Sequence, residues 1–570
     1  MHRILLILIF PILAYSQDYQ LVTGKTCDGY PQISVGSIPG SCIGLVASSQ
    51  LKDKNGETLK FPRKIIELKP NLFLISDMGG WEPPFQGKIW LLDSSQNKLT
   101  KLIDKLTLPH GLAIGPDGMI YVGEMGLIFK FDPNSPKPSQ TCQTVIHNLP
   151  STVLRTKGNP CIDEKVSKAT QEISHPLVSF TFSKNPSTAG NLIVNSGSSS
   201  DNCTDKSGKI KVDSQGRCSE MEGSNPGASV REYEYLGNGN WNPNFRILAR
   251  GLRNSMVLVS HESGNIIQME NSMDFPDAKE PFEEINILKE ARHYGWPYCF
   301  NFKGQNPIYN LFFKCDGTNK SYEEPYALIP PHTAPLDGLY YSGNMFPELQ
   351  NTLLVSWHGY RGTGQRIVSY PTNTDGLPYV SQDTFYYNSY NPKTDKTQKI
   401  QANPAGGLVR TASYTEVVFD WYKVPNLRPI GAPVGLTVAS DGAIWVVEDK
   451  NKTILRIAKG KSSNDNGSNQ NSSTLDEKKF NDSVFMARWS KIQKNILTPQ
   501  CATCHNQVQN QNGKELIKEL VSSGWMNPGN SSESLIVKRL KGGEMRLMPP
   551  QGPLQTRDIQ AIEQFIDDLD

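Results

Sequence analysis

A two-strand unit recurs six times between residues 60 and 457, and this repeat restricts the fold more than any other feature of the sequence. In each copy an apolar, β-rich run is followed by a turn and a second run of the same kind. The clearest copies, residues 111–122 and 435–447, have an Asp-Gly turn at Asp117 and Asp441. Asp-Gly between two apolar runs is a strong hairpin signal. The looser copies are residues 71–92, 178–194, 256–268 and 339–355.

Six repeated hairpins predict a mainly β fold, a six-bladed β-propeller, because radially repeated sheets leave only short, protected edges. The copies are spaced unevenly, by about 40 to 100 residues, so we expect long insertions between the blades. A pair of β-sandwiches is the alternative that the same strand pattern allows. In a propeller, the functional site lies where loops between strands converge at the mouth of the channel.

The composition changes after the last repeat. Residues 458–476 are rich in Ser, Asn, Gly and Lys and have no apolar periodicity, which predicts a flexible linker. It would separate a propeller at residues 17–457 from a small C-terminal all-α domain at residues 477–570. In that domain, an apolar stripe at residues 480–496 has helical spacing, and Thr556 is a candidate cap for a closing helix. A core this small needs an additional staple.

The N-terminus has the pattern of a signal peptide at residues 1–16. His2 and Arg3 precede an apolar run at residues 4–14, and small residues precede Gln17. The run is too short to cross a bilayer. We therefore expect an exported, periplasmic or secreted protein with no membrane insertion. The charges nearly balance, with 58 Lys+Arg against 56 Asp+Glu, so there is no basic footprint for nucleic acid.

Ten cysteines support export, because cysteines in an oxidising compartment pair with each other or hold a cofactor. Eight of them follow one another along the chain as four neighbouring couples. Pairing within the couples is one of about 105 possible connectivities. The expected couples are Cys27 with Cys42, Cys142 with Cys161, Cys203 with Cys218 and Cys299 with Cys315.

The remaining two cysteines form the C-x-x-C-H motif Cys501-Ala-Thr-Cys504-His505, which is the attachment signature of c-type haem. In such a motif, two thioethers fix the haem and the histidine becomes an iron ligand. A thioredoxin-type redox pair would need a βαβ surround, and a zinc site would need a second Cys/His pair. Neither is present in the sequence. The motif therefore predicts a covalently bound haem c.

The second axial ligand of the haem iron is expected to be a methionine, because His505 is the last histidine of the chain. Met548 precedes two prolines that would stiffen its loop, and Met545 and Met526 are the competitors. A methionine ligand raises the haem potential, which suits an electron acceptor. The segment resembles small single-haem cytochrome c domains, which share an approach helix, the C-x-x-C-H motif, a Met-Pro-Pro loop and a closing helix.

Motifs in the propeller resemble a second family. Residues 249–254 read Ala-Arg-Gly-Leu-Arg-Asn, and residues 293–298 read His-Tyr-Gly-Trp-Pro-Tyr. Residues 331–335 (Pro-His-Thr-Ala-Pro) and residues 174–182, which begin Ser-His-Pro, complete the set. Together they resemble the soluble pyrroloquinoline quinone (PQQ) dehydrogenases, the glucose/sorbosone and aldose sugar dehydrogenases. The resemblance covers roughly residues 60–457 and implies a six-bladed propeller.

The resemblance also implies roles for single residues. His175 matches the general base that removes the proton of the substrate hydroxyl while hydride passes to the quinone. Arg253 matches the arginine beside the reactive carbonyl, and Asn254 matches its quinone-binding neighbour. Each side chain suits its task, since an imidazole with an ordinary pKa of about 6.5 is a base at neutral pH and a guanidinium stabilises an oxyanion.

Three further residues are implied in the same way. Gly295 and Pro297 match the positions whose backbone carbonyls hold Ca²⁺, a hard cation that prefers oxygen ligands. Arg361 falls near the basic residue that pairs with the PQQ carboxylates.

The sequence departs from the family at several points. The glucose enzymes have two arginines before the last blade, where this chain has only Arg428 nearby. The aromatic residue that stacks on the quinone is replaced near residues 327–331. His110 is a rival candidate for the base, and His332 and His358 are further candidates for the lining of the mouth.

The two halves together predict a quinohaemoprotein. The propeller would oxidise a hydroxyl of an aldose-type sugar onto PQQ, and the tethered haem would pass the electrons to a periplasmic acceptor. Two alternatives stay open. One is a calcium-dependent lactonase with an appended cytochrome, and the other is a propeller that only binds carbohydrate or a partner.

Overall fold

The computed structural model describes residues 19–81, 86–147, 149–150, 159–161, 173–309, 313–424, 431–460, 477–501, 508, 513–522, 525–541 and 554–569. The chain folds into two compact units, with the boundary after Gly460. Each unit is described by itself.

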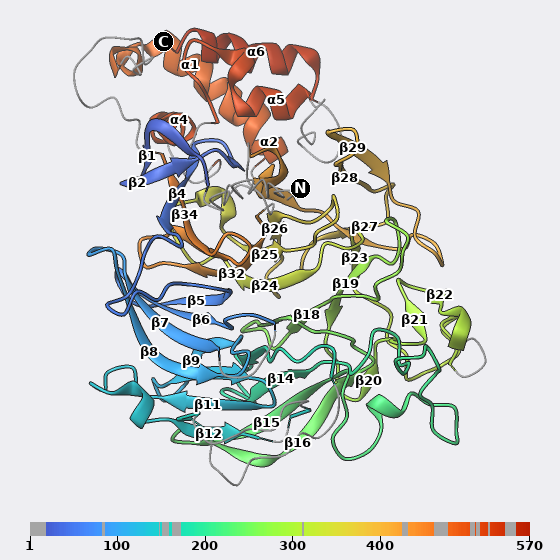
Figure 1. Cartoon of the computed structure of the whole chain (residues 1–570). Helices are drawn as coiled ribbons and strands as arrows, with labels where there is room; N and C mark the ends of the chain where they lie inside the picture. The colour runs from blue at the N-terminus through green and yellow to red at the C-terminus, as the bar shows by residue number, and fades with distance from the viewer. Residues whose placement is uncertain are drawn as a thin grey trace, which may run out of the picture. The chain divides into compact units, whose positions relative to one another are not determined.

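The first unit is a six-bladed β-propeller, as the repeat predicts (Figure 1). Blades 1 to 3 are β5 (Pro62–Lys69), β6 (Leu72–Asp77), β7 (Gly87–Asp93) and β8 (Lys98–Leu106); β9 (Leu112–Ile114), β10 (Ile120–Glu124), β11 (Leu127–Phe131) and β12 (Gln143–Ile146); and β13 (Phe180–Phe182), β14 (Leu192–Ser196), β15 (Ser229–Gly237) and β16 (Asn240–Arg250). Blades 4 to 6 are β17 (Val257–Ser260), β18 (Ile266–Glu270), β19 (Glu283–Ile287) and β23 (Ala327–Ile329); β24 (Pro335–Tyr340), β25 (Thr352–Trp357), β26 (Arg366–Pro371) and β31 (Thr415–Phe419); and β32 (Pro433–Val438), β33 (Ile444–Glu448), β34 (Thr453–Lys459) and β4 (Ser41–Ala47).

Short strands extend the blades. The sheet of blade 3 continues into β20 (Arg292–His293), that of blade 4 into β30 (Thr411–Ala412) and β27 (Val380–Ser381), and that of blade 5 into β3 (Gly36–Ser37). Beyond β4, the last sheet adds β2 (Tyr30–Ile33) and β1 (Leu21–Cys27). Two insertions form hairpins of their own, β21 (Cys299–Phe300) with β22 (Gly304–Gln305) and β28 (Tyr386–Asn391) with β29 (Lys396–Gln401).

The N-terminal segment closes the ring, because β4 supplies the outer strand of a blade whose other strands come from residues 433–459. Its register with β34 pairs Ile43 with Ile457. In Figure 1 the blue β4 accordingly lies beside the orange β34. Apolar packing also joins the first and last blades, since the rings of Phe73 and Trp445 stack with centroids 3.9 Å apart. Closure in this form removes the exposed edge strands of an open sheet.

Five of the six predicted hairpins coincide with the first two strands of a blade, and the sixth is displaced by one strand. Residues 71–92 form β6 and β7, the second and third strands of blade 1. The inner strand β5 has Arg63 and Lys64 near its start, so it does not read as apolar. Both charged side chains are nevertheless paired, Arg63 with Asp449 and Lys64 with Asp337.

Four disulfides join the eight propeller cysteines in the sequential couples that we expected. The bridge between Cys27 and Cys42 ties β1 to β4, the strand that closes the ring. No helix of the described residues is long and apolar enough to cross a bilayer.

The second unit is helical in its described residues and packs around one apolar core. Asp482 caps its first helix by accepting hydrogen bonds from the amides of Val484 and Phe485. Val484 does not belong to the buried stripe, since its side chain is 69% exposed. Thr556 is the first residue of the closing helix rather than its cap, which is Gln555. The helices are α1 (Ser483–Ile492), a π-helical turn at Gln493–Leu497, α2 (Thr498–Cys501), α4 (Gly513–Ser522), α5 (Leu535–Lys541) and α6 (Thr556–Asp567).

Removing the Cys27–Cys42 disulfide should lower the stability of the propeller. The bridge closes a loop of 15 residues, and such a loop contributes about 3 kcal/mol through the entropy of the unfolded chain. We expect the Cys27→Ala/Cys42→Ala variant to unfold at lower urea concentration, with a free energy of unfolding reduced by about 3 kcal/mol. The control is the Cys203→Ala/Cys218→Ala variant, which removes a disulfide that closes a loop of equal length but joins no strand of a blade. An unchanged midpoint in the first variant would show that β4 is held without the bridge.

Candidate functional site at the mouth of the channel

One end of the channel gathers the candidate residues. In every blade the inner strand starts where the second strand ends, as the pairs Pro62–Asp77 and Val257–Met269 illustrate. Cross-blade contacts connect all six blades at or near this end, which we call the mouth. They are Ser76 Oγ to the His110 carbonyl, Gly111 N to the Val178 carbonyl, Ser198 N to the Arg253 carbonyl, Ala334 N to Glu283, Leu436 N to Asp337, and Arg63 to Asp449.

His175 and Arg253 meet at the mouth through one serine. The Nδ1 atom of His175 lies 2.8 Å from Ser198 Oγ and 3.1 Å from the Ser198 carbonyl oxygen. The Ser198 amide donates to the Arg253 carbonyl over 2.8 Å. Burial and the charge of Arg253 lower the pKa of His175 well below its usual value. The imidazole is therefore neutral at neutral pH.

The contacts of Ser198 also fix the tautomer of this imidazole. A carbonyl oxygen can only accept, so the contact with Nδ1 places the hydrogen on that nitrogen. The Ser198 hydroxyl donates to the Ser200 carbonyl over 2.5 Å, and its oxygen is thereby left to accept from Nδ1 as well. His175 Nε2 is then the unprotonated, basic nitrogen.

Arg253 is buried, with 5% of its surface exposed, and two carboxylates compensate its charge. Its Nη2 atom lies 2.7 Å from Asp201 Oδ1 and 2.8 Å from Asp274 Oδ2. Nη1 donates to the Asn271 carbonyl over 3.0 Å. The guanidinium is held from three sides, which fixes its position.

Two atoms of neighbouring side chains have no partner in this network. Arg253 Nε, a donor, and Asn254 Oδ1, an acceptor, are both buried without a hydrogen bond in the described part of the chain. Buried polar groups are normally satisfied, so such atoms need an explanation. A polar ligand that offers an acceptor to Arg253 and a donor to Asn254 would supply one.

Arg361 lies across the loop that follows β18. Its Nη1 and Nη2 atoms donate to the carbonyls of Asp277 and Phe275, each over 2.8 Å, and Nη1 also contacts His332 Nε2 at 2.7 Å. Burial, together with the charge of Arg361, lowers the pKa of His332. Among the described residues no carboxylate pairs with Arg361, so its charge is available to an anion.

Gly295 and Pro297 form a tight turn whose carbonyls already accept hydrogen bonds. The Gly295 carbonyl accepts from the amides of Tyr298 and Cys299, over 2.8 and 2.9 Å. The Pro297 carbonyl accepts from Asn306 Nδ2 over 2.7 Å. Both lone pairs of the first oxygen are therefore used. No group of three or more His, Cys, Asp or Glu side chains in the described residues is arranged to hold a metal ion.

A second cluster at the mouth joins blades that are far apart in the sequence. Arg63 Nη1 pairs with Asp449 Oδ2 at 2.7 Å, and the two side chains are 2% and 1% exposed. Arg63 Nε contacts His110 Nδ1 at 3.3 Å, and His358 Nε2 contacts Asp449 Oδ1 at 3.0 Å. Burial opposes ionisation of Asp449, but His358 and Arg63 outweigh it and hold its pKa at about 2.

Sequence reasoning named His110 and His358 as candidates and missed Arg63 and Asp449. The expected basic residue of the last blade lies at Arg428, outside the described residues. Arg63 is the buried arginine of the adjoining blade. The signal for Arg63 was weak, because Lys64, Glu67 and Lys69 of the same strand are charged as well.

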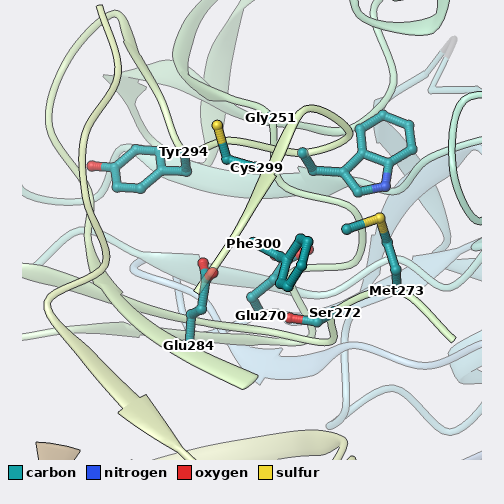
Figure 2. Close-up of a pocket in the computed structure, with 9 residues that line it drawn as sticks. Gly251, Glu270, Ser272, Met273, Glu284, Tyr294, Cys299 and Phe300 are labelled. Atoms are coloured by element: carbon teal, nitrogen blue, oxygen red, sulfur yellow. The ribbon is translucent and has the colours of Figure 1, made fainter. Parts of the chain in front are cut away.

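A small pocket is lined in part by Gly251, at the start of the loop that leads to Arg253 (Figure 2). Its volume of about 10 Å³ is room for about one water molecule, so no tricyclic quinone fits there. Burial raises the pKa of Glu270 to about 7 and that of Glu284 well above its usual value. The pocket is lined by Gly251, Glu270, Ser272, Met273, Glu284, Tyr294, Trp296, Cys299 and Phe300.

The haem motif lies mostly outside the described residues. Cys501 ends α2 and packs, partly buried, against the helical core. Cys504, His505 and Met548 lie in segments that the structure does not describe. Met526, a competitor for the second axial position, is 1% exposed within that core.

Loss of the Asp449 carboxylate should destabilise the propeller strongly. It would leave the Arg63 charge buried without its partner, which typically costs about 3–5 kcal/mol. We expect Asp449→Asn to reduce the free energy of unfolding by an amount in this range, measured by urea unfolding. The control is Asp420→Asn, since Asp420 pairs with a largely exposed Lys423 and should contribute less than about 1 kcal/mol. Equal losses in the two variants would contradict a special role for the buried pair.

Comparisons with known proteins agree with this architecture. The iodide and calcium structures of the Trichoderma reesei Carbohydrate-Active Enzymes Family AA12 protein are each 18% identical, with a TM-score of 0.51. The similarity covers 76% of this chain and 98% of theirs, and it shows a shared fold. The holo form of the pyranose dehydrogenase PQQ domain from Coprinopsis cinerea is also 18% identical over 76% of this chain and 99% of its own, with a TM-score of 0.49.

A curated relative, an uncharacterized protein of Borreliella burgdorferi, is 28% identical over 215 residues. That match covers 37% of this chain and spans about half of the relative, 48% of its length. The family model described as TrAA12-like matches residues 56–460, which is more than half of the chain. The chain therefore belongs to the TrAA12-like family.

Proposed function

We propose that this protein is an exported PQQ-dependent dehydrogenase that oxidises a hydroxyl of an aldose-type sugar and passes the electrons to its own c-type haem. Membership of the TrAA12-like family and the carbohydrate-active AA12 proteins that share its fold support an oxidoreductase acting on sugars. Four disulfides support an oxidising compartment. A periplasmic protein is the proposed electron acceptor.

One observation carries the proposal. The two adjacent residues that the resemblance assigns to the quinone, Arg253 and Asn254, are among those with an unpartnered buried polar atom, a donor on Arg253 and an acceptor on Asn254. The proposed base, His175, connects to the same backbone through Ser198. These atoms fit a ligand with a carbonyl oxygen and a ring N–H, and PQQ has both.

His175 would act as the general base. Its Nδ1 hydrogen is held by Ser198, so Nε2 accepts the proton of the substrate hydroxyl. The lowered pKa keeps this nitrogen unprotonated at neutral pH. PQQ, when bound, supplies the electrophilic carbon that accepts the hydride.

Two arginines would hold the anionic groups. Arg253, fixed by Asp201 and Asp274, presents its Nε hydrogen to the oxygen on which negative charge develops. Arg361 donates to two carbonyls and contacts His332, and its charge can turn to a carboxylate of the cofactor. Both arginines already lie at the mouth, so no rearrangement of the blades is needed to place them there.

Calcium is proposed on the resemblance alone. The Gly295 carbonyl has both lone pairs engaged and the Pro297 carbonyl has one, so a cation would have to replace a hydrogen bond of this turn. We assign no catalytic step to it.

The proposed haem is attached to Cys501 and Cys504, with His505 and Met548 as iron ligands. Trp489 in the helical core has a buried Nε1 hydrogen without a partner in the described residues, and an acceptor on a bound group would satisfy it. The linker would keep the haem at a high effective concentration near the propeller.

The catalytic proposal predicts that purified protein reduces a dye with an aldose only after PQQ and Ca²⁺ are added. His175→Ala should lower turnover by about 100-fold or more, because the general base is lost. His261→Ala is the matched control, since this histidine lies in the turn between β17 and β18, away from the mouth. Lactone hydrolysis without PQQ would favour the lactonase, and sugar binding unaffected by His175→Ala and without turnover would favour a binding propeller.

The haem proposal predicts a covalent haem after expression with the haem-attachment machinery. Reduction of this haem by sugar should require PQQ, and the absorption spectrum reports it directly. Cys501→Ala/Cys504→Ala should retain dye reduction and lose the haem, which mass spectrometry detects. Non-covalent haem in wild-type protein, or none, would refute the attachment.

A further inference from the structure

Four of the six blades place a carboxylate at the same position, the last residue of the second strand. Each of these side chains is almost fully buried, with at most 4% exposed. Each accepts a backbone amide of the loop that enters the inner strand of its own blade. The pairs are Asp77 with Lys60 and Phe61, Glu124 with Thr107, Glu270 with Arg253 and Asn254, and Glu448 with Ala432.

In blade 4 the anchored loop is the one that carries the proposed quinone residues. Glu270 Oε1 accepts the amide of Arg253 over 2.5 Å and that of Asn254 over 3.1 Å. Gln268 Nε2 donates to the other carboxylate oxygen over 2.7 Å. The acid thereby fixes the backbone from which both side chains project.

The same anchor reaches the proposed base. The Arg253 carbonyl accepts the Ser198 amide, and the Ser198 hydroxyl and carbonyl hold His175 Nδ1. A displacement of the Arg253 peptide would therefore move the serine that orients the imidazole.

We propose that Glu270 is the positioning residue of this site, which holds Arg253 and Asn254 directly and His175 through Ser198 in the arrangement that receives the cofactor. This inference rests on the proposed function, since it names how that site is kept in order. Glu270 contacts neither substrate nor cofactor in this role. Its negative charge strengthens both amide hydrogen bonds, because a hydrogen bond to an ionised acceptor is stronger than one to a neutral acceptor.

The anchor is sensitive to protonation. Burial, opposed by the hydrogen bonds from Asn254 and Gln268, raises the pKa of Glu270 to about 7. The charged groups packed against it are Arg253 and the neighbouring acids Glu283 and Glu284, whose pKa values burial also raises, that of Glu283 to about 8. As pH falls through about 7, Glu270 takes up a proton and its hold on the loop weakens.

The test measures PQQ affinity by fluorescence titration of the full-length apo-protein with Ca²⁺ present. Glu270→Gln should weaken binding by about 10-fold or more, because a charge-assisted hydrogen bond is lost. The PQQ affinity of the wild type should fall as pH is lowered from 8 to 6. The PQQ affinity of the Glu270→Gln variant should lack the part of this fall that comes from protonation of Glu270. Glu283 is present in both proteins, and the Glu270 charge raises its pKa, so in the variant its titration moves to lower pH and any pH dependence left there is assigned to Glu283.

The matched control is Glu124→Gln, which removes the same anchor from blade 2, where the anchored residue is Thr107. It should lose thermal stability as Glu270→Gln does and bind PQQ like the wild type. Equal weakening in both variants, or wild-type affinity in Glu270→Gln, would overturn the inference.

Hydrogen exchange covers the remaining outcomes. If the variants do not fold, or if wild-type protein binds no PQQ and the proposed function fails, the amides of residues 251–256 are followed in the wild type. Corrected for intrinsic rates, their protection should decrease as pH falls through about 7. Protection that is independent of pH would refute the anchor whatever the cofactor.

Discussion

Backbone amides at the mouth of the channel must be satisfied away from water, and buried carboxylates satisfy them. An unpaired buried N–H group costs about 1–3 kcal/mol, so a loop that turns into an inner strand needs acceptors. Asp77, Glu124, Glu270 and Glu448 provide them from the adjacent strand of the same blade. These hydrogen bonds therefore hold the loops in place, although the loops have no regular structure.

These carboxylates are ionisable groups in the protein interior, and the shifted pKa values of two of them show that burial disfavours the charged form. Burial raises the pKa of Glu270 and of Glu448 to about 7 each. Asp449 differs, because Arg63 and His358 face it and hold its pKa at about 2. Asp449 thus stays charged, whereas Glu270 and Glu448 titrate near neutral pH. All three side chains are buried, so the difference between their pKa values comes from the groups that face each carboxylate.

The architecture was predictable because its signals are local. Apolar runs joined by Asp-Gly turns identify hairpins, and the neighbouring cysteines pair as their order suggests. The inner strand β5 was not predicted from the sequence, because Arg63 and Lys64 interrupt its apolar pattern. Their partners Asp449 and Asp337 lie far away in the sequence, and only the closed ring brings them close.

Glu270 was missed for another reason, since one acid at a strand end looks like a solvent-exposed turn residue. The signal was its recurrence at the same position of other blades.

The blades without an acid at this position clarify the site. Blade 3 ends its second strand with Ser196, and that strand leads to Ser198, which holds His175. Ser196 Oγ donates to the Pro226 carbonyl over 3.1 Å and accepts from Arg231, so its side chain is engaged with blade 3 itself. The amide oxygen of Asn195 accepts the Ser179 amide over 2.7 Å and so anchors the loop that carries His175. Burial and the charge of Arg253 lower the pKa of the imidazole. The loop of the proposed base is therefore held by a neutral acceptor, whereas the loop of Arg253 and Asn254 is held by an acid.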